Sequence, residues 1–314
     1  MAQISFRFFL LSMFVLVQIA TPSVMAKDSG RWLASVKGPS NVLFEAWFRV
    51  LADGQHAGYV YQTFEYDPKK RELQSAYYLR TDERAGNVIE ALKARSTDSL
   101  KPLSYQYTSS VKGKTKTIDA TFKDNRFLAT IQDAGQKRIV DRTIEKGTFL
   151  STFLIYVMLK NENGIKLGAN YSYSAIAEED AQVYRDGEAF VKDTQSILGR
   201  DAFRVVNRFN KVQFISFVTD RGEVMGTQSP FLGISTELVK TMAEATQGFT
   251  VDRRSLNFLF GRVAETTSIE MSNAASSGKQ EQLQKEDGSA GPKGDKVDPG
   301  KGIHIKKGEE ADEK

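Results

Sequence analysis

The sequence predicts a mainly β protein: a curved antiparallel sheet, or half-barrel, wrapped around one or two helices. Two observations predict this fold. Short segments in which apolar and polar residues alternate, as at Ile118, Ala120 and Phe122, follow one another and are separated by turn sequences. One segment, Phe149–Leu159, is apolar with almost no polar residue, as expected for a helix that a curved sheet surrounds.

The strands before the apolar segment are predicted as hairpins. Residues Val42–Tyr66 alternate on both sides of the turn sequence Asp53-Gly54 and therefore predict the first hairpin. The same reasoning predicts strands at Leu73–Thr81, Val88–Ser96, Leu103–Val111, Lys116–Lys123, Arg126–Gln132 and Lys137–Thr143.

The apolar segment Phe149–Leu159 is interpreted as a short helix, and a buried central strand is the alternative. Thr148 or Ser151 is the expected N-cap, because a hydroxyl accepts from the free N–H groups of a first turn.

Five more strands and a second helix are predicted after this segment. Thr236–Gln247 is expected to be helical, with Ser235 as its N-cap and Gly248 as its stop. Ile234 and Val239 have the spacing of a hydrophobic staple. The strands are Asn170–Ala177, Gln182–Thr194, Asp201–Asn207, Gln213–Thr219 and Val224–Gln228.

Residues 1–26 have the pattern of a cleavable signal peptide. Arg7 is followed by the apolar run Phe8–Ile19, and small side chains precede the expected cleavage after Ala26. A membrane anchor is the alternative, but a helix of about 12 residues is roughly 18 Å long and a bilayer core is ~30 Å thick. We therefore expect no transmembrane anchor after cleavage.

The rest of the chain divides by composition. Residues 27–40 form a polar leader, residues 41–275 one β-rich domain, and residues 276–314 a polar tail without Phe, Trp or Tyr. Such a tail buries too little apolar surface to fold, so it is predicted to be disordered. The chain has no cysteine, which excludes disulfides and a lipid-modified cysteine and favours a bacterial periplasm.

Several function classes are excluded. The net charge of +4 is small and scattered, so no nucleic-acid partner is expected. Of the two histidines, His304 lies in the tail and His56 follows a turn, so they do not form a multi-histidine metal site. Gly113-Lys114-Thr115 imitates the end of a phosphate-binding loop but lies between two predicted strands. We expect no cofactor and no metal.

Two acidic clusters, Glu178-Glu179-Asp180 and Asp186-Gly187-Glu188, are interpreted as solvated loop charge. The alternative is a hydrolase of envelope polymers that uses Glu178, Glu179, Asp186 and Glu188.

Aromatic residues crowd the predicted strands. They are explained either by core packing or by an apolar ligand groove in the curved sheet, and the two explanations are compatible. No catalytic residue is assigned, and the candidate ligand-binding residues are Trp47, Tyr59, Tyr61, Tyr105, Phe153 and Tyr156.

Four segments carry a resemblance to a known family. They are Trp47 with Asp53–Tyr59, Leu100–Tyr105, Gly147–Leu159 followed by Leu167–Tyr171, and Thr219–Val224. Between roughly Phe44 and Thr227 the chain resembles exported bacterial domains of unknown function, which occur alone or beside transglutaminase-like domains. The resemblance implies a half-barrel like that of periplasmic lipoprotein carriers, with binding as its role, and it assigns no catalytic residue.

The first functional prediction is therefore a non-enzymatic periplasmic binding or carrier protein for an apolar or lipid-like ligand. The alternative is an envelope assembly module that binds a protein partner, with the tail as its tether. The carboxylate-dependent hydrolase is the third.

Overall fold

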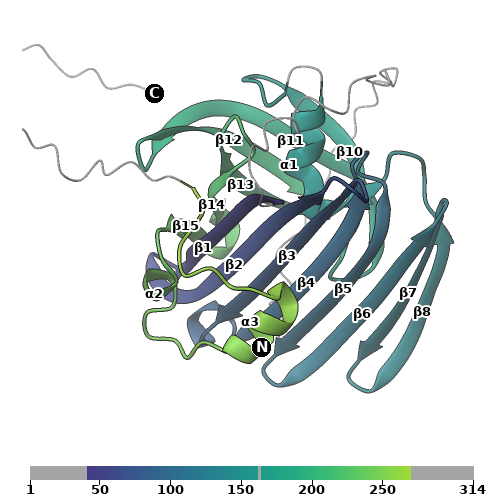
Figure 1. Ribbon diagram of the computed structural model, residues 1–314, viewed down its shortest axis with the longest axis horizontal. Coiled ribbons are helices and arrows are strands. Elements are labelled where there is room, and N and C mark those ends of the chain that lie inside the picture. The colour runs from purple at the N-terminus through teal and green to yellow at the C-terminus, as the bar shows by residue number, and fades with distance from the viewer. Residues whose placement is uncertain (1–40, 162–163, 270–314) are drawn as a thin grey trace, which may run out of the picture. The chain divides into compact units, whose positions relative to one another are not determined.

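A computed structural model of the protein describes residues 41–161 and 164–269, and its strands form one sheet of 15. The sheet order is β8-β7-β6-β5-β4-β3-β2-β1-β15-β14-β13-β12-β11-β10-β9, and only β9 and β10 run parallel (Figure 1). The prediction of a mainly β fold with a curved antiparallel sheet is confirmed. The predicted signal peptide, leader and tail lie outside the described residues.

The first half of the sheet is a run of hairpins, as the turn sequences predict. Type I′ geometry at turns such as Ala134-Gly135, where both residues have positive φ, matches the twist of the flanking strands. The strands are β1 (Val42–Ala52), β2 (Gln55–Asp67), β3 (Glu72–Thr81), β4 (Val88–Thr97), β5 (Pro102–Val111), β6 (Lys114–Lys123), β7 (Arg126–Asp133) and β8 (Gln136–Thr143), with the 3-10 turn η1 (Glu83–Ala85) between β3 and β4.

The second half of the sheet returns to the first strand. Its last strand, β15, pairs with β14 on one side and with β1 on the other. The strands are β10 (Asn170–Ala177), β11 (Gln182–Ile197), β12 (Arg200–Phe209), β13 (Val212–Val218), β14 (Val224–Ser229) and β15 (Ile234–Val239), with the turn η3 (Pro230–Leu232) before β15.

The predicted helix over Thr236–Gln247 is wrong. Residues Ile234–Val239 are strand β15, and the helix α2 is only Met242–Ala245, capped by Thr241. Leu238 and Val239 are both buried but belong to different core clusters, as expected for neighbours on a strand. Pairing with β1 and β14 satisfies the backbone of this segment from both sides, and this outweighs its local helical signals.

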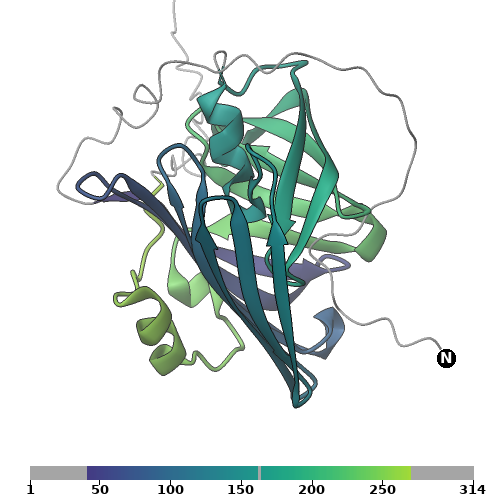
Figure 2. The ribbon, with the colours of Figure 1, turned by 90° about the vertical axis from the view of Figure 1, so that its right-hand side faces the viewer.

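The apolar segment begins with β9 (Phe149–Leu150) and continues as η2 (Ser151–Phe153) and α1 (Leu154–Lys160). The helix prediction is confirmed, but the predicted cap is wrong, because neither η2 nor α1 has a side-chain N-cap. We call residues Ser151–Lys160 the η2–α1 segment. Figure 2 shows α1 between the strands of the two halves of the sheet.

The η2–α1 segment is apolar all round because both of its sides are buried. Phe153 and Tyr156 belong to the cluster that covers the inner face of β1–β8 and extends onto β12–β15. Leu154 and Met158 belong to a second cluster, with residues of β10–β13 such as Val205. The segment therefore gives both halves of the curved sheet a surface against which to bury apolar side chains.

Helices α2 and α3 (Arg253–Phe260) lie against the outer face of β1–β3. The sequence analysis does not predict α3, which begins at Asp252, whose carboxylate accepts from the Ser255 N–H at 3.0 Å. None of the helices among the described residues is long and apolar enough to cross a membrane.

Gly58 lies where two strands come unusually close. A Cβ at this position would collide with the Arg80 carbonyl oxygen and would lie 2.9 Å from the Thr81 Cα, both of them backbone atoms of β3. The second glycine of the motif Asp53–Gly58 is therefore required by strand packing, whereas Gly54 is required by its φ of 78°.

We predict that Gly58→Ala lowers the free energy of unfolding by about 2–3 kcal/mol, because backbone atoms do not move aside as side chains do. Gly54→Ala, which meets nothing within 4 Å, is the matched control and costs about 1 kcal/mol from its φ alone. Urea unfolding measures both, and equal costs would contradict this account of Gly58.

Candidate functional site

The six aromatic candidates do not form one groove. Trp47, Tyr59 and Tyr61 are buried in the cluster on the outer face of β1–β3, whereas Tyr105, Phe153 and Tyr156 are buried in the inner cluster. The two sets lie on opposite faces of the sheet, because side chains alternate along a strand.

The outer three residues are covered by the chain itself. The indole of Trp47 stacks on Tyr61 at 4.4 Å and donates to the Ala264 carbonyl at 2.7 Å. The Tyr61 ring meets Phe260 of α3 edge-on at 4.6 Å, and its oxygen accepts from the Ala264 N–H at 3.0 Å. Tyr59 packs against Tyr78 at 6.1 Å and Phe249 at 5.9 Å, and its buried hydroxyl has no hydrogen-bond partner among the described residues. The outer set therefore packs against the segment after α2.

Of the inner three residues, Phe153 and Tyr156 belong to the η2–α1 segment, and Tyr105 shares their core cluster. Phe64 of β2 lies 5.0 Å from Tyr156 and 6.2 Å from Phe153, measured between ring centroids. Tyr105 of β5 is 1% exposed, and its hydroxyl has no hydrogen-bond partner among the described residues. A buried hydroxyl without a partner is costly, so this one marks a place to which a polar group could bind.

The turn between β10 and β11 points acidic side chains into this interior, so the interpretation of Glu178 as solvated loop charge is wrong. Glu178 is 3% exposed. Its carboxylate accepts from the Ser151 hydroxyl at 2.5 Å and from the Thr152 N–H at 3.2 Å. It therefore supplies the acceptor that the first turn of η2 lacks from its own N-cap.

The next two residues of the turn are half-buried. Glu179 Oε1 is shielded from solvent without a partner among the described residues, while Lys116 donates to the Glu179 carbonyl at 2.7 Å. The Asp180 carboxylate accepts from the Tyr184 hydroxyl at 2.7 Å and from the Gln182 N–H at 2.9 Å. Asp180 thus stabilises the turn, whereas the Glu179 carboxyl is left available.

A fourth carboxyl, Glu90 of β4, was not predicted. It accepts from the Tyr107 hydroxyl at 2.8 Å and lies 3.4 Å from that of Tyr77. Val88 and Leu92, two residues away on either side, are buried in the core. The sequence does carry a signal for Glu90: it is a charged residue at a position of an alternating strand where the side chain points inward.

These four carboxyl groups hold their protons more tightly than ordinary ones. Burial raises the pKa of Glu178 from 4.5 to about 7. Burial, together with the charges of Asp180 and Glu178, raises the pKa of Glu179 well above its usual range. Burial also raises the pKa of Glu90 and of Asp180, against the opposing effect of their tyrosine hydrogen bonds. The interior therefore contains acidic side chains that stay protonated to a higher pH than solvated carboxyls do, among several tyrosines.

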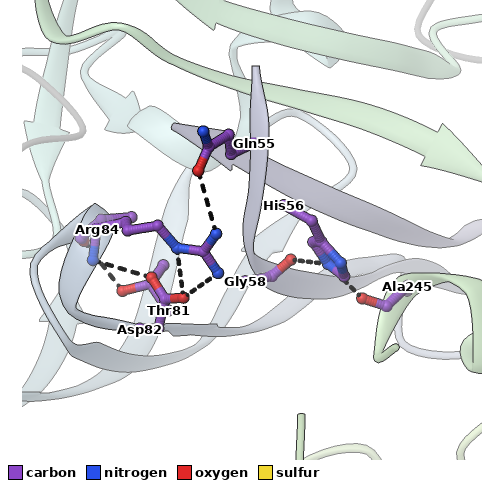
Figure 3. A network of polar contacts seen from close by, with 8 residues as sticks. Gln55, His56, Gly58, Thr81, Asp82, Arg84 and Ala245 are labelled. Atoms are coloured by element: carbon purple, nitrogen blue, oxygen red, sulfur yellow. Dashed lines mark hydrogen bonds and ion pairs between the residues drawn. The ribbon is translucent and has the colours of Figure 1, made fainter. Parts of the chain in front are cut away.

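His56 has a structural role. Its Nε2 lies 2.9 Å from the Gly58 carbonyl oxygen and 3.1 Å from that of Ala245, which ties the start of β2 to α2 (Figure 3). The ring also packs against Phe249 at 5.2 Å. Beside it, Arg84 forms an ion pair with Asp82 at 2.6 Å.

The second acidic cluster differs from the first. Asp186 and Glu188 on β11 are exposed, as predicted for solvated charge, so they do not join Glu178 and Glu179 in the interior. Within residues 41–161 and 164–269, no three Asp, Glu or His side chains gather in a way that could hold a metal ion.

Two open hollows lie on the outer face of the first half of the sheet, away from the η2–α1 segment. One, of about 520 Å³, spans β4–β7 and is lined mainly by polar residues such as Lys93, Gln106 and Asp119. The other, of about 290 Å³, is lined by residues of β6 and β7 and of the turn into β8, among them Thr117 and Gln132. Neither is lined by residues of the η2–α1 segment, although the first includes Tyr105.

No protein-family model and no curated protein matches the sequence. Among solved structures, the chain is distantly similar to a beta-barrel-like protein of the domain of unknown function DUF1849 from Brucella abortus, with 12% identity and a TM-score of 0.45 over 64% of this chain and 97% of that one. It is also similar to a DUF1089 family protein from Pseudomonas aeruginosa, with 11% identity and a TM-score of 0.30 over 55% of this chain and 90% of that one.

We predict that Glu178→Gln flattens the dependence of stability on pH. The pKa of Glu178 is higher in the folded chain than in the unfolded chain, so its stabilising effect is complete below about pH 4.5 and is lost as the pH rises through about 7. The loss is about 3 kcal/mol. Gln does not titrate, and it can accept from the Thr152 N–H through Oε1 while its Nε2 donates to the Ser151 hydroxyl.

Urea unfolding at about pH 5 and about pH 8 measures this difference. The unmodified chain is expected to lose more stability between the two pH values than Glu178→Gln. The exposed Glu188→Gln is the control and should lose as much as the unmodified chain. Equal losses in all three proteins would show that Glu178 does not titrate in this range.

Proposed function

We propose that this chain is a non-enzymatic binding or carrier protein of the bacterial periplasm for an apolar or lipid-like ligand, and a member of the exported family that its motifs resemble. The observation that carries the proposal is the η2–α1 segment, a short apolar element between the two halves of an open sheet. We propose that this segment occupies the ligand's place when no ligand is bound.

The way the segment is held supports this proposal. Polar contacts hold the start of the segment: Ser151 and Thr152 bind Glu178, and the Thr152 hydroxyl lies 3.0 Å from that of Ser75 on β3. Further along, Phe153, Leu154 and Met158 are buried in two apolar core clusters. A ligand with an apolar body could replace those contacts because they are not directional.

Polar groups close to the segment supply a place for the ligand's head. The Tyr105 hydroxyl and Glu179 Oε1 are both shielded from solvent without a partner among the described residues. A head group with a hydrogen-bond donor would satisfy Glu179, and one with an acceptor would satisfy Tyr105. The proposed ligand is therefore amphipathic, with a small polar head.

The alternative function, an envelope module with a protein partner and the tail as its tether, depends on residues 276–314. These lie outside the described residues.

A reversible disulfide tests whether the segment must move for binding. Because the chain has no cysteine, Ser75→Cys with Thr152→Cys creates a single pair, and the two hydroxyl oxygens that the sulfurs replace lie 3.0 Å apart. We expect oxidation to weaken binding of the apolar probe N-phenyl-1-naphthylamine by roughly tenfold or more, and reduction to restore it.

The matched control is Thr227→Cys with Thr236→Cys, whose hydroxyls lie 2.9 Å apart across β14 and β15. Its oxidised form should bind the probe like the unmodified chain. Undiminished binding by the oxidised Ser75–Thr152 variant would contradict the proposal. So would native mass spectrometry that finds no small molecule on protein purified from the envelope.

A further inference from the structure

Strand β8 forms an open end of the sheet. It pairs with β7 and is the first strand in the sheet order, at the outer edge of Figure 1. An edge strand presents a row of N–H and C=O groups that another strand can bind. The proposed function does not use this edge.

The turn into β8 fixes which backbone groups point outward. Asp133 and Gln136 flank a two-residue turn and so form a hydrogen-bonded pair. Bonding alternates along an antiparallel pair, so every second residue from Gln136 bonds to β7. Lys137, Ile139 and Asp141 therefore direct their N–H and C=O groups to the free side.

The side chains of these three residues form a symmetrical pattern. Ile139 is 62% exposed and lies opposite Thr130 of β7, while Leu128 of β7, which is 43% exposed, lies opposite Asp141. Lys137 precedes Ile139 by two residues and Asp141 follows it by two, so all three share the outer face of the sheet. A strand with opposite charges equally spaced about an apolar centre is complementary to an antiparallel copy of itself.

We propose that β8 pairs antiparallel with β8 of a second copy of this chain, with Ile139 on the twofold axis. The two Ile139 side chains then meet, and each Lys137 lies opposite Asp141 of the partner subunit. Such a pairing is isologous, so it closes as a dimer and joins the two sheets into one.

The charges on β8 select this register. Edge strands often carry charged residues that prevent pairing, and Arg138 and Arg142 fit that role. An axis at Arg138 would place this residue opposite itself, and an axis at Val140 would place it opposite Arg142 of the partner subunit. Like charges directly opposite are destabilising, whereas with the axis at Ile139 no like charges face each other.

A single cysteine tests the register, because the chain has none of its own. Residues directly opposite in an antiparallel pair have Cα atoms about 5.5 Å apart, within disulfide range. We expect Ile139→Cys to form a covalent dimer under mild oxidation at least roughly tenfold faster than Phe258→Cys, since pairing raises the local thiol concentration. Phe258 is 90% exposed on α3 and controls for random collision.

Sedimentation velocity of the full chain supplies the second test. The unmodified protein should show a dimer that grows with concentration, and Lys137→Glu should weaken it by roughly tenfold, because two like-charged pairs then form. A monomer at every concentration would overturn the proposal. So would equal crosslinking rates for Ile139→Cys and Phe258→Cys. Neither result depends on ligand binding, so failure here leaves the proposed carrier function standing.

Discussion

The burial of the Glu178 carboxyl against the first turn of η2 is the contact on which the interior depends. Because neither η2 nor α1 has a side-chain N-cap, that carboxyl accepts from Ser151 and Thr152 and fixes where the segment begins. With its start fixed, Phe153 and Tyr156 join the core cluster of β1–β8, which extends onto β12–β15, while Leu154 and Met158 join the cluster of β10–β13. Without the segment, two concave apolar faces would have nothing to pack against. Burying a carboxylate costs free energy, which hydrogen bonds offset only in part. The raised pKa of Glu178 reflects the cost that remains.

The parts of the fold that could be predicted are those that nearby residues determine. Hairpins β1 to β8 follow from alternation and turn residues that lie a few positions apart. Strand β15 could not be found this way, since Ile234–Val239 carries the local signals of a helix start and becomes a strand only through pairing with β1, which lies far away in the sequence. The turn Glu178–Asp180 illustrates the same limit: three adjacent acids indicate solvent exposure, and only the position of η2 provides the donors that allow Glu178 to be buried.

Only part of the candidate site could be predicted, again because the rest depends on residues that are distant in the sequence. Aromatic residues on strands indicate packing, but a single sequence does not say that both faces of β1–β3 are covered. Trp47 and Tyr61 pack beneath α3, whereas Tyr105 faces the η2–α1 segment from the opposite side of the sheet. Glu90, Tyr77 and Tyr107 were missed because each is unremarkable alone, and only strand register brings their oxygens together.

Strand β1 also constrains the order in which the chain can fold. One edge of β1 pairs with β15. The backbone N–H groups of Glu45 and Trp47 donate to the side chains of Ser268 and Thr267, which lie 223 and 220 residues further along the chain. The first strand to be synthesised is therefore among the last to be completed, and until then it exposes an unpaired edge and an aromatic face. Contacts between residues so far apart in the sequence slow folding, and they prolong the lifetime of intermediates that expose apolar surface and are prone to aggregate. While it folds, this protein should depend on chaperones that shield its first hairpin until β15, Thr267 and Ser268 reach it.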